Sequence, residues 1–487
     1  MALKSNLRLK ASKRLLYVSL IIIIGGFLRF WELDKDSYWL DEGASLFTVN
    51  RSLTEMIEFE PNPPLFNIVL HYWIKLFGIK EQFTRLLPAL FSLISLFFVF
   101  KLAKRLFYYP VALGTTLIFA LSPYQIFYAQ ELRTYSLLFL LTMISMYYLI
   151  RLIDENLWKQ KSIYIIVTLC LLLTHIYGWF VFLTQFLWIV YIKRKLDKDW
   201  LIVFIAIFIL FLPYLAYFIP TISKISGHFW IAKPGIIHFF GNAVPVSGSV
   251  PLFLFYALLI CILFFLWYRH KNSKSIKINQ PVKFLLLWII ITYLVPFVLS
   301  LFVTPFFLER YLIVTAFPIV VIFVYLIELL AAQKIKTIIY SLFILLSLFE
   351  IAQDIRQPTR EPWRDMALDL KAKAKTNDIF IVAAGFCIDN IFQFYSDSLA
   401  NIQIGIDTED IKENIWHDKI QDHISSDQNC IWLILSHFNS NEFLLTEYFN
   451  SRHQYVKQID YPHRDLFGRN IVNLKVRKYK NKLLNSD

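Results

Sequence analysis

Residues 86–105 read LLPALFSLISLFFVFKLAKR, an apolar run that ends in a cluster of basic residues. A run of this kind suits a helix of about 20 residues that crosses a hydrocarbon core roughly 30 Å thick. Similar runs recur through the first 350 residues of this 487-residue chain. The chain is only 17% charged, whereas a soluble globular protein carries about 25% charged residues. We therefore predict a polytopic α-helical membrane protein.

The basic residues are distributed unevenly between the loops that separate these runs. Alternate loops hold 22 Lys and Arg residues on one side and 9 on the other. Because positively charged loops stay in the cytoplasm, we predict a cytoplasmic N-terminus in a plasma (inner) membrane. The net charge of +13 thus reports orientation, and we expect no nucleic-acid partner. The predicted transmembrane helices, about eleven in all, are residues 15–30, 86–103, 111–128, 135–151, 163–178, 179–192, 200–219, 251–268, 283–303, 311–330 and 336–351.

Residues 63–78, PPLFNIVLHYWIKLFG, are predicted to form an amphipathic helix and not a span. Asn67, His71 and Lys75 recur every four residues, so one stripe of the helix is polar. Such a helix lies in the membrane interface, here within the first outer loop, residues 31–85. Counting it as a span also reverses the charge bias of the loops, which settles the choice.

The composition changes near residue 352, where polar stretches begin to alternate with short β-branched runs. Helix-like segments lie between these runs, a pattern typical of an α/β domain. We predict a transmembrane domain over residues 1–351 and a small C-terminal α/β domain over residues 352–487. An odd number of spans makes this second domain extracytoplasmic. The predicted strands are DIFIVAA (378–384), NIQIGI (401–406), CIWLILS (430–436) and IVNLKV (471–476).

Ionisable and tyrosine side chains gather at the predicted outer ends of several spans. Charges near membrane depth are costly and usually face a cavity or one another, so this gathering indicates a membrane-surface active site. Simpler roles stay open: solvated loop acids, arginines that extend to the lipid headgroups, and ion pairs or buried histidines that only stabilise the fold. The candidates are Arg29, Asp41, Glu42, Glu131, Arg133, Tyr135, His175, Arg310 and Tyr311, with Asn62, His71 and Lys233 as further lining residues.

The order of three motifs resembles that of a known family. WLDE (39–42) is followed by NPPLFNIVLHYWIKLFG (62–78) and then by LSPYQIFYAQELRTYSLLFLL (121–141). This order is similar to that in bacterial relatives of the dolichyl-phosphate-mannose protein mannosyltransferases, in the C-type superfamily of membrane glycosyltransferases. The resemblance implies an enzyme that transfers a hexose or pentose from a polyprenyl-phosphate carrier on the extracytoplasmic face. The acceptor hydroxyl belongs to a lipid, glycan or protein of the cell envelope.

The resemblance assigns catalysis to the acidic residues. Asp41 matches the first-loop aspartate that such enzymes use, and we expect it to act as the base of a single inverting displacement, with Glu42 beside it. Glu131 matches the acid of the second outer motif. It is expected to hold a neighbouring arginine or, with His175, to ligate a divalent metal cation, the one cofactor that the sequence leaves open.

The leaving phosphate of such a donor needs positive charge. Arg133 and Tyr135 match the second outer motif, and Arg310 and Tyr311 match an Arg-Tyr pair at the entry to a late span. Arginine suits phosphate because its planar fork binds two oxygens at once. We expect these four residues, with Arg29, to bind the donor phosphate.

Three other functions stay open on the sequence alone. A transporter or flippase for lipid-linked sugars also needs a large bundle, but it places polar groups near the bilayer midplane, where the predicted spans are mostly Leu, Ile, Phe and Val. A glycan polymerase or ligase uses a diphosphate-linked donor. A non-catalytic envelope protein uses its outer domain to bind a partner.

Overall fold

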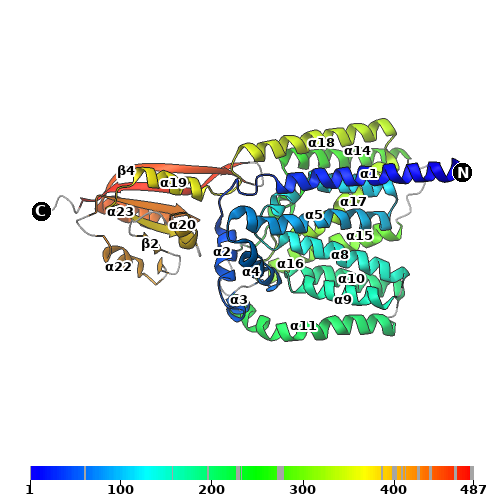
Figure 1. The fold of residues 1–487 in the computed structure, drawn as a ribbon, viewed down its shortest axis with the longest axis horizontal. Coiled ribbons are helices and arrows are strands. Elements are labelled where there is room, and N and C mark those ends of the chain that lie inside the picture. The colour runs from blue at the N-terminus through cyan, green and yellow to red at the C-terminus, as the bar shows by residue number, and fades with distance from the viewer. Residues whose placement is uncertain are drawn as a thin grey trace. The chain divides into compact units, whose positions relative to one another are not determined.

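The computed structural model of the protein divides into two compact units (Figure 1). The first unit contains Met1–Leu33 and Arg51–Ala352, and the second contains Asp34–Asn50 and Gln353–Asp487. The segment Asp34–Asn50 therefore groups with the C-terminal part of the chain, although the sequence suggests a loop of the transmembrane domain. The structure describes residues 2–59, 62–155, 157–194, 197–225, 231, 233–270, 279–384, 388–396, 403–406, 410–411, 413–424, 428–437, 441–465 and 469–482.

The first unit is built from helices, most of which run alongside one another (Figure 1). In chain order they are α1 (Ala2–Phe30), α3 (Leu53–Phe59), α4 (Leu65–Phe77), α5 (Glu81–Leu106), α6 (Tyr109–Leu121), α7 (Pro123–Ala129), α8 (Tyr135–Asp154), α9 (Trp158–Leu172), α10 (Tyr177–Lys193), α11 (Lys198–Ile225), α12 (Ile236–Gly241), α13 (Ala243–Ser247), α14 (Val250–His270), α15 (Gln280–Ile289), the π-helix η1 (Ile290–Leu294), α16 (Val295–Phe302), the 3-10 helix η2 (Glu309–Leu312), α17 (Ile313–Leu330) and α18 (Gln333–Arg356).

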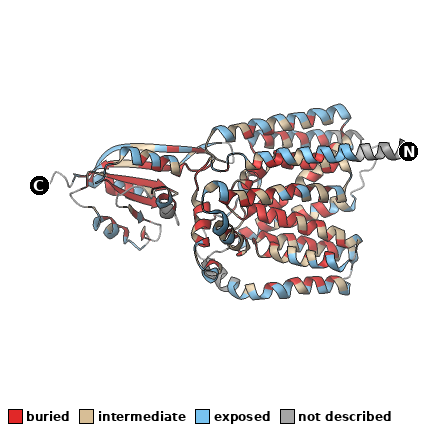
Figure 2. Cartoon of the chain, in the orientation of Figure 1, coloured by how far each residue is buried: buried red, intermediate tan, exposed pale blue. Residues whose placement is uncertain are grey.

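The centre and the rim of this bundle differ in burial. α5 packs against α1, α6 and α8, while α17 packs against α6, α14 and α15. α8 is mostly buried, whereas the apolar side chains of α11 and α18 are mostly exposed (Figure 2). In water such exposed apolar faces are rare, so the rim of the bundle suits contact with lipid.

Six helical segments of the described chain are long and apolar enough to cross a membrane. Two bent helix pairs raise this number to eight if each pair is one span: α6 with α7, bent by 58°, and α12–α13 with α14, bent by 103°. A multi-pass helical membrane protein is thus confirmed, but the predicted count of about eleven spans is not. The other predicted spans, 15–30, 163–178 and 179–192, overlap α1, α9 and α10. The second of them is too long at its end, because α9 ends at Leu172, and α9 and α10 contain only 15 and 17 residues.

The predicted amphipathic segment 63–78 forms α4, so the predicted helix is confirmed. On its polar stripe, Asn67 is buried, His71 is half-buried and Lys75 is exposed. α4 packs against α5 inside the first unit. Its place at the membrane interface stays a prediction.

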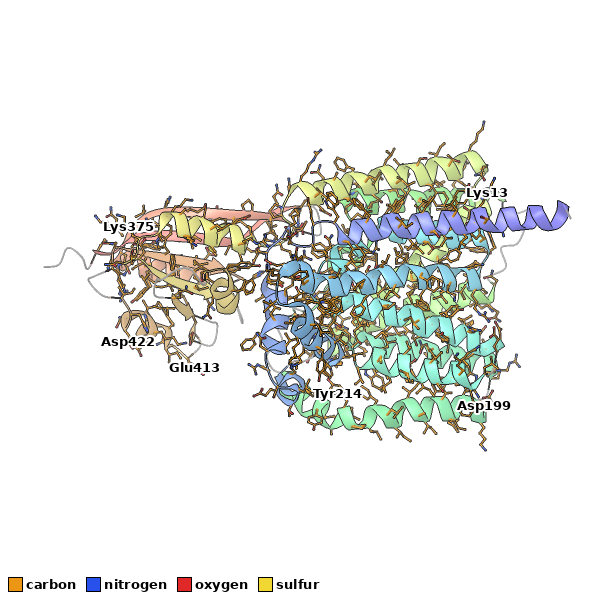
Figure 3. All side chains as sticks on the ribbon, in the orientation of Figure 1. Lys13, Asp199, Tyr214, Lys375, Glu413 and Asp422 are labelled. Atoms are coloured by element: carbon orange, nitrogen blue, oxygen red, sulfur yellow. The ribbon has the colours of Figure 1, made fainter. Side chains whose placement is uncertain are left out.

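Two predicted cytoplasmic segments lie at the same end of the helical bundle. Lys13, from segment 1–14, and Asp199, from segment 193–199, both lie at this end (Figure 3). Tyr214, on α11, lies toward the opposite end of the bundle (Figure 3). The structure thus places these two segments at one end of the bundle, while the membrane face that they occupy stays a prediction.

The second unit is a mixed α/β sheet with helices on both faces. Its elements are α2 (Leu40–Val49), α19 (Trp363–Lys373), β1 (Ile379–Ala384), α20 (Ile388–Ser396), β2 (Gln403–Ile406), α22 (Trp416–Gln421), β3 (Cys430–Ser436), α23 (Glu442–Arg452), β4 (Gln454–Arg464) and β5 (Asn470–Lys480). The strand order is β2-β1-β3-β5-β4, with β1 parallel to β2 and β3, and β5 antiparallel to β3 and β4. The four predicted strands are confirmed over their described residues, and residues 401 and 402 of the second lie outside these. The sequence missed β4, because this edge strand is mostly polar.

Alternate residues of β1 and β3 face two separate apolar cores. Ile381 and Leu433 pack with side chains of α22 and α23. Phe380 and Trp432 point the other way and pack with side chains of α19 and α20. Strands that are buried on both faces read as continuous apolar runs, as these two do. The carboxyl ends of β1 and β3 consequently meet at one edge of a rigid sheet.

Candidate functional site

Three turns of the first unit bring polar and aromatic side chains together. The first turn joins α7 to α8, the second joins α9 to α10, and the third is η2. The helical pattern breaks at each of these points, and each break carries polar residues inside an otherwise apolar sequence. The three-turn cluster consists of Glu131, Arg133, Tyr135, His175, Arg310 and Tyr311.

The aromatic rings of the three-turn cluster contact one another across the turns. The ring centre of His175 lies 4.5 Å from that of Tyr311 and 6.3 Å from that of Tyr135. The rings of Tyr135 and Tyr311 are 6.2 Å apart. The guanidinium carbon of Arg310 lies 6.0 Å from the ring centre of Tyr135 and 5.7 Å from that of Tyr311. Four of the predicted site residues therefore form one contiguous group.

The charged members of the cluster lie close enough to influence one another. Glu131 and His175 are each 1% exposed, while Arg133 is half-buried. The positive charges of Arg133 and Arg310 both act on His175. Its Nδ1 accepts a hydrogen bond of 3.2 Å from the amide of Tyr177, so the ring hydrogen lies on Nε2. His175 thus offers a hydrogen-bond donor in surroundings dominated by two arginines.

Hydrogen bonds and one close backbone approach hold the three turns in register. The hydroxyl of Thr134 donates to the carbonyl of Thr174 at 3.2 Å, which joins the first turn to the second. The hydroxyl of Tyr124 donates to the carbonyl of Glu309 at 2.6 Å, which joins α7 to η2. At Gly178 a Cβ atom would lie 2.5 Å from a backbone carbonyl of α9, so only glycine permits this tight connection to α10.

The guanidinium of Arg29 is buried among α1, α5 and α6. It donates to Ser92 Oγ at 2.8 Å and to the carbonyls of Phe119 and Ala120 at 2.9 and 3.1 Å. Pro123 lacks the amide hydrogen that pairs with the carbonyl of Phe119 in a continuous helix, and Arg29 supplies that hydrogen bond instead. These contacts favour a structural role for Arg29 over the predicted contact with the donor phosphate.

We expect Arg29→Met to destabilise the bundle without weakening donor use. Each lost hydrogen bond from a charged donor is worth about 1.5–3 kcal/mol, so the unfolding temperature in detergent should fall clearly below that of the unaltered protein. Lys13→Met, which also replaces a positive charge by Met at an exposed position of α1, is the control and should leave the unfolding temperature unchanged. A raised KM for the lipid-linked donor in the Arg29 variant, with unchanged stability, would return Arg29 to the phosphate site.

The three remaining lining candidates come from other segments of the first unit. Asn62 is half-buried just before α4, and His71 lies within α4, where its ring contacts Tyr72 edge-on at 5.3 Å. Lys233 is exposed shortly before α12. Their part in the site stays a prediction.

The two acids of WLDE lie in different surroundings in the second unit, at the start of α2. Glu42 is fully buried, and its Oε2 lies 4.0 Å from Nε of Arg360. Nη1 of Arg360 lies 3.7 Å from Oδ2 of Asp36, which also accepts a hydrogen bond of 3.1 Å from the amide of Thr359. Asp41 is only half-buried. The contacts of Glu42 favour a role in holding α2 in place over the catalytic role predicted for it.

We expect Arg360→Met to destabilise the second unit, because it leaves Glu42 and Asp36 buried without their counter-charge. Breaking a buried ion pair costs about 3 kcal/mol or more. Adding Glu42→Gln to this variant should restore part of the lost stability, since the amide carries no charge. Unfolding of the purified protein in detergent measures both effects. Arg356→Met, at an exposed position of the second unit, is the control. Equal stability of the Arg360→Met and Arg356→Met variants would contradict the ion pairing.

A further acid–histidine pair lies in the second unit. Glu361 is 1% exposed, and its carboxylate accepts hydrogen bonds from Trp363 Nε1 at 2.9 Å and from Ser436 Oγ at 3.1 Å. Nε2 of His437 lies 2.7 Å from Oε1 of the same carboxylate. The sequence did not predict this pair, because no spacing rule connects residues as far apart in the chain as Glu361 and His437. The one available signal was that His437 directly follows the strand CIWLILS.

The electrostatics of this pair favour both charged forms. Burial raises the pKa of Glu361, but the contact and charge of His437 outweigh it, so the pKa is lowered from its ordinary value. Burial lowers the pKa of His437, but the contact and charge of Glu361 and the charge of Asp41 outweigh it. The pKa of His437 is therefore raised above 6.5.

A metal centre finds no support in the part of the chain that the structure describes. No group of three or more His, Cys, Asp or Glu side chains there is arranged to hold a metal ion. Glu131 and His175 together supply two ligands, whereas catalytic zinc sites use three protein ligands.

A family model matches the part of the chain that contains the first two turns. Residues 61–217 match the model described as dolichyl-phosphate-mannose-protein mannosyltransferase, and this match confirms the resemblance seen in the sequence. The matched residues include α4 and, from the three-turn cluster, Glu131 to His175. No curated protein matches the chain significantly.

Solved structures share the fold of the chain. ArnT from Cupriavidus metallidurans in the apo state aligns with a TM-score of 0.59 at 11% identity, over 96% of this chain and 98% of that chain. The same protein bound to undecaprenyl phosphate aligns with a TM-score of 0.56 at 12% identity, over 97% and 99%. An oligosaccharyltransferase from Archaeoglobus fulgidus, tethered with an acceptor peptide, aligns with a TM-score of 0.52 at 9% identity, over 94% and 74%. At these identities the likeness shows that the chain shares the fold of these proteins, and nothing more.

Proposed function

With this shared fold as the premise, we propose that the chain transfers a sugar from a polyprenyl-phosphate carrier to an acceptor hydroxyl on the extracytoplasmic face of the plasma (inner) membrane. The observation that carries this proposal is the three-turn cluster, where two arginines, two tyrosines and a histidine from separate turns lie together. ArnT, which shares the fold, has been solved with undecaprenyl phosphate bound. The donor class therefore agrees with both the residues and the fold.

The three-turn cluster suits the phosphate end of such a donor. The bond from the anomeric carbon to the phosphate oxygen breaks, so the departing polyprenyl phosphate gains negative charge. Arg133 and Arg310 bind that charge, and bidentate guanidinium contacts make arginine the better cation for this task. His175 donates from Nε2 to a phosphate oxygen. Tyr135 and Tyr311 keep the guanidinium of Arg310 over their ring faces, at distances typical of cation–π contacts.

Asp41 supplies the base of the reaction. The new bond forms between the acceptor oxygen and the anomeric carbon, on the face opposite the departing phosphate, and the configuration inverts. The acceptor hydroxyl loses its proton to the carboxylate of Asp41 late in the step, when bond formation has made it acidic. A base positioned in this way contributes about 10²–10⁴-fold to the rate. The sugar donor is already activated, so the reaction needs no nucleotide.

A turnover assay tests this proposal directly. Purified protein in lipid nanodiscs is offered a radiolabelled polyprenyl-phosphate sugar together with an extract of envelope lipids and glycans. We expect label to leave the donor and polyprenyl phosphate to appear in equal amount. Mass spectrometry of envelope lipids, glycans and proteins from cells with and without the gene then identifies the acceptor.

The same assay separates the rival functions. A transporter or flippase moves the donor between leaflets and leaves the sugar–phosphate bond intact. A polymerase or ligase consumes a diphosphate-linked donor in preference to the monophosphate. An envelope protein without catalytic activity leaves both donors unchanged. Any of these three results would overturn the proposed transfer from a polyprenyl-phosphate donor.

A further inference from the structure

His437 occupies a strained position at the edge of the sheet where ligands bind in open α/β folds. It directly follows β3, at the end where the parallel strands β1 and β3 both terminate. Ligands of such sheets sit beyond the carboxyl ends of the strands. The backbone of His437 has a φ of +51°, a conformation that few residues other than glycine adopt. Strain of this kind persists where the surroundings over-determine a side chain, and it gathers at functional sites.

The side chain of His437 is held by a carboxylate that is itself fixed. Glu361 keeps its orientation through the hydrogen bonds from Trp363 and Ser436. The imidazole of His437 retains 30% exposure, so the ring is anchored at one nitrogen and open to solvent elsewhere. An acid that holds a histidine in one orientation is the usual support of a functional imidazole.

The residues beside Glu361 also hold the segment that carries Asp41. The hydroxyl of Ser37 donates to the main-chain carbonyl of Glu361 at 2.7 Å. Arg360, the preceding residue, lies within 4.0 Å of Glu42, the neighbour of Asp41. The segment is therefore attached to residues 360 and 361 on both sides of Asp41. Within this frame the negative charge of Asp41 acts on His437.

We propose that His437 is a positioning residue for Asp41: its imidazolium, fixed by Glu361, holds the carboxylate of Asp41 charged and correctly oriented for proton transfer. This role rests on the proposed function of Asp41 as the base. Because electrostatic coupling is reciprocal, an acid that favours the charged histidine is itself favoured in its charged form by that histidine. The sequence resemblance points to Asp41, whereas only the folded second unit reveals its partner.

A second histidine lies near the pair formed by Glu361 and His437. Burial, and to a smaller extent the charge of His437, lower the pKa of His463, on β4, below its ordinary value. Glu361 and Asp41 are the two acids that raise the pKa of His437. Two acids from two different segments thus favour the positive charge of His437, and burial opposes it.

The first arm of the test requires no sugar transfer. A raised folded-state pKa stabilises the protein below pH 6.5, and this stabilisation disappears as pH rises through the folded-state pKa of His437. We expect the unfolding temperature of the full-length protein in detergent to show this loss, and His437→Gln to remove it. Asp41→Asn should move the loss to lower pH, because it removes one of the two acids. An unmoved loss in the Asp41 variant would overturn the coupling, whether or not the protein transfers sugar.

The second arm follows the reaction and compares a neutral with a charged replacement. His437→Gln should lower kcat roughly tenfold with little change in donor KM, and it should move the acid limb of the pH profile to higher pH, since Asp41 then takes up a proton more readily. His437→Lys keeps a positive charge and should retain the acid limb near its original position. His423→Gln, at an exposed histidine of the same unit, is the control and should leave the profile unchanged.

A purely structural role for His437 predicts a different result. The Gln and Lys variants would then lose folded protein to the same extent, while the pH profile per folded molecule would stay unchanged, and that outcome would refute the proposal. If the unaltered protein transfers no sugar at all, the function proposed above fails, while the stability arm still decides whether Asp41 and His437 are coupled.

Discussion

Asp41→Asn is expected to leave a protein that expresses and inserts normally but has lost about 10²–10⁴-fold in kcat for sugar transfer. The substitution keeps the size and the hydrogen-bonding shape of the side chain and removes only its ability to accept a proton. Asp41 is half-buried at the start of α2, and its neighbour Glu42 makes the buried ion pair that holds this helix. Glu42 therefore holds α2, and we expect the protein to fold with a neutral side chain at position 41.

Two controls sharpen this test. Asp34→Asn changes an exposed acid of the same segment and should leave turnover unchanged. Glu42→Gln should lower stability and leave turnover per folded molecule within a few-fold of the unaltered protein. Near-normal turnover by the Asp41 variant would remove the base from the mechanism. A large loss of turnover in the Glu42 variant, at normal stability, would show that Glu42 and not Asp41 is the base.

The second large effect concerns the two arginines of the three-turn cluster. Arg133→Ala and Arg310→Ala should each reduce donor kcat/KM by about 10²–10³-fold, the usual consequence of removing a group that stabilises developing negative charge. The Lys variants should recover part of this loss, because they restore the charge without the bidentate fork. Steady-state kinetics with donor and acceptor varied in turn measure the effect.

The distribution of the effect between the two substrates identifies its cause. If the arginines bind the leaving phosphate, donor KM and kcat change while acceptor KM does not. Arg151→Lys alters an arginine that pairs with Glu155 at the surface of the bundle, and it should have little effect. Equal changes in donor and acceptor use would count against phosphate binding by Arg133 and Arg310.

Much of this architecture follows from local sequence patterns. Long apolar runs predict helices wherever lipid replaces water as the solvent, and each predicted span lies mostly within helices of the structure. The spans 111–128 and 163–178, however, each cross a break between two helices. The number of helices that cross the membrane is harder to predict from the sequence, because α9 and α10 are short and two further candidate spans are bent helix pairs. The three turns of the cluster were predictable for a related reason. Charged residues near membrane depth are costly, so they interrupt an apolar sequence only where they face a cavity or one another.

The parts that the sequence did not reveal depend on contacts between distant residues. Ser37 and Glu361 are separated by 324 residues, yet their hydrogen bond places α2 in the second unit. The same long-range pairing decides that Glu42 is buried against Arg360, while Asp41 beside it is half-buried. Nothing in WLDE distinguishes the two acids. Only the three-dimensional neighbours of each acid separate a structural carboxylate from a candidate base.

The hydrogen bonds of Arg29 also constrain the order in which the chain assembles. Its carbonyl acceptors, Phe119 and Ala120, follow it by 90 and 91 residues, so α1 is synthesised well before they exist. An arginine within a membrane helix carries a cost of about 2.5–3.5 kcal/mol at the helix centre, and Arg29 avoids this cost early on by staying at the aqueous end of α1. Its burial has to await the arrival of α6. We therefore expect the docking of α6 onto α1 to be a distinct step of biogenesis, one that ribosome-stalled chains of increasing length can time.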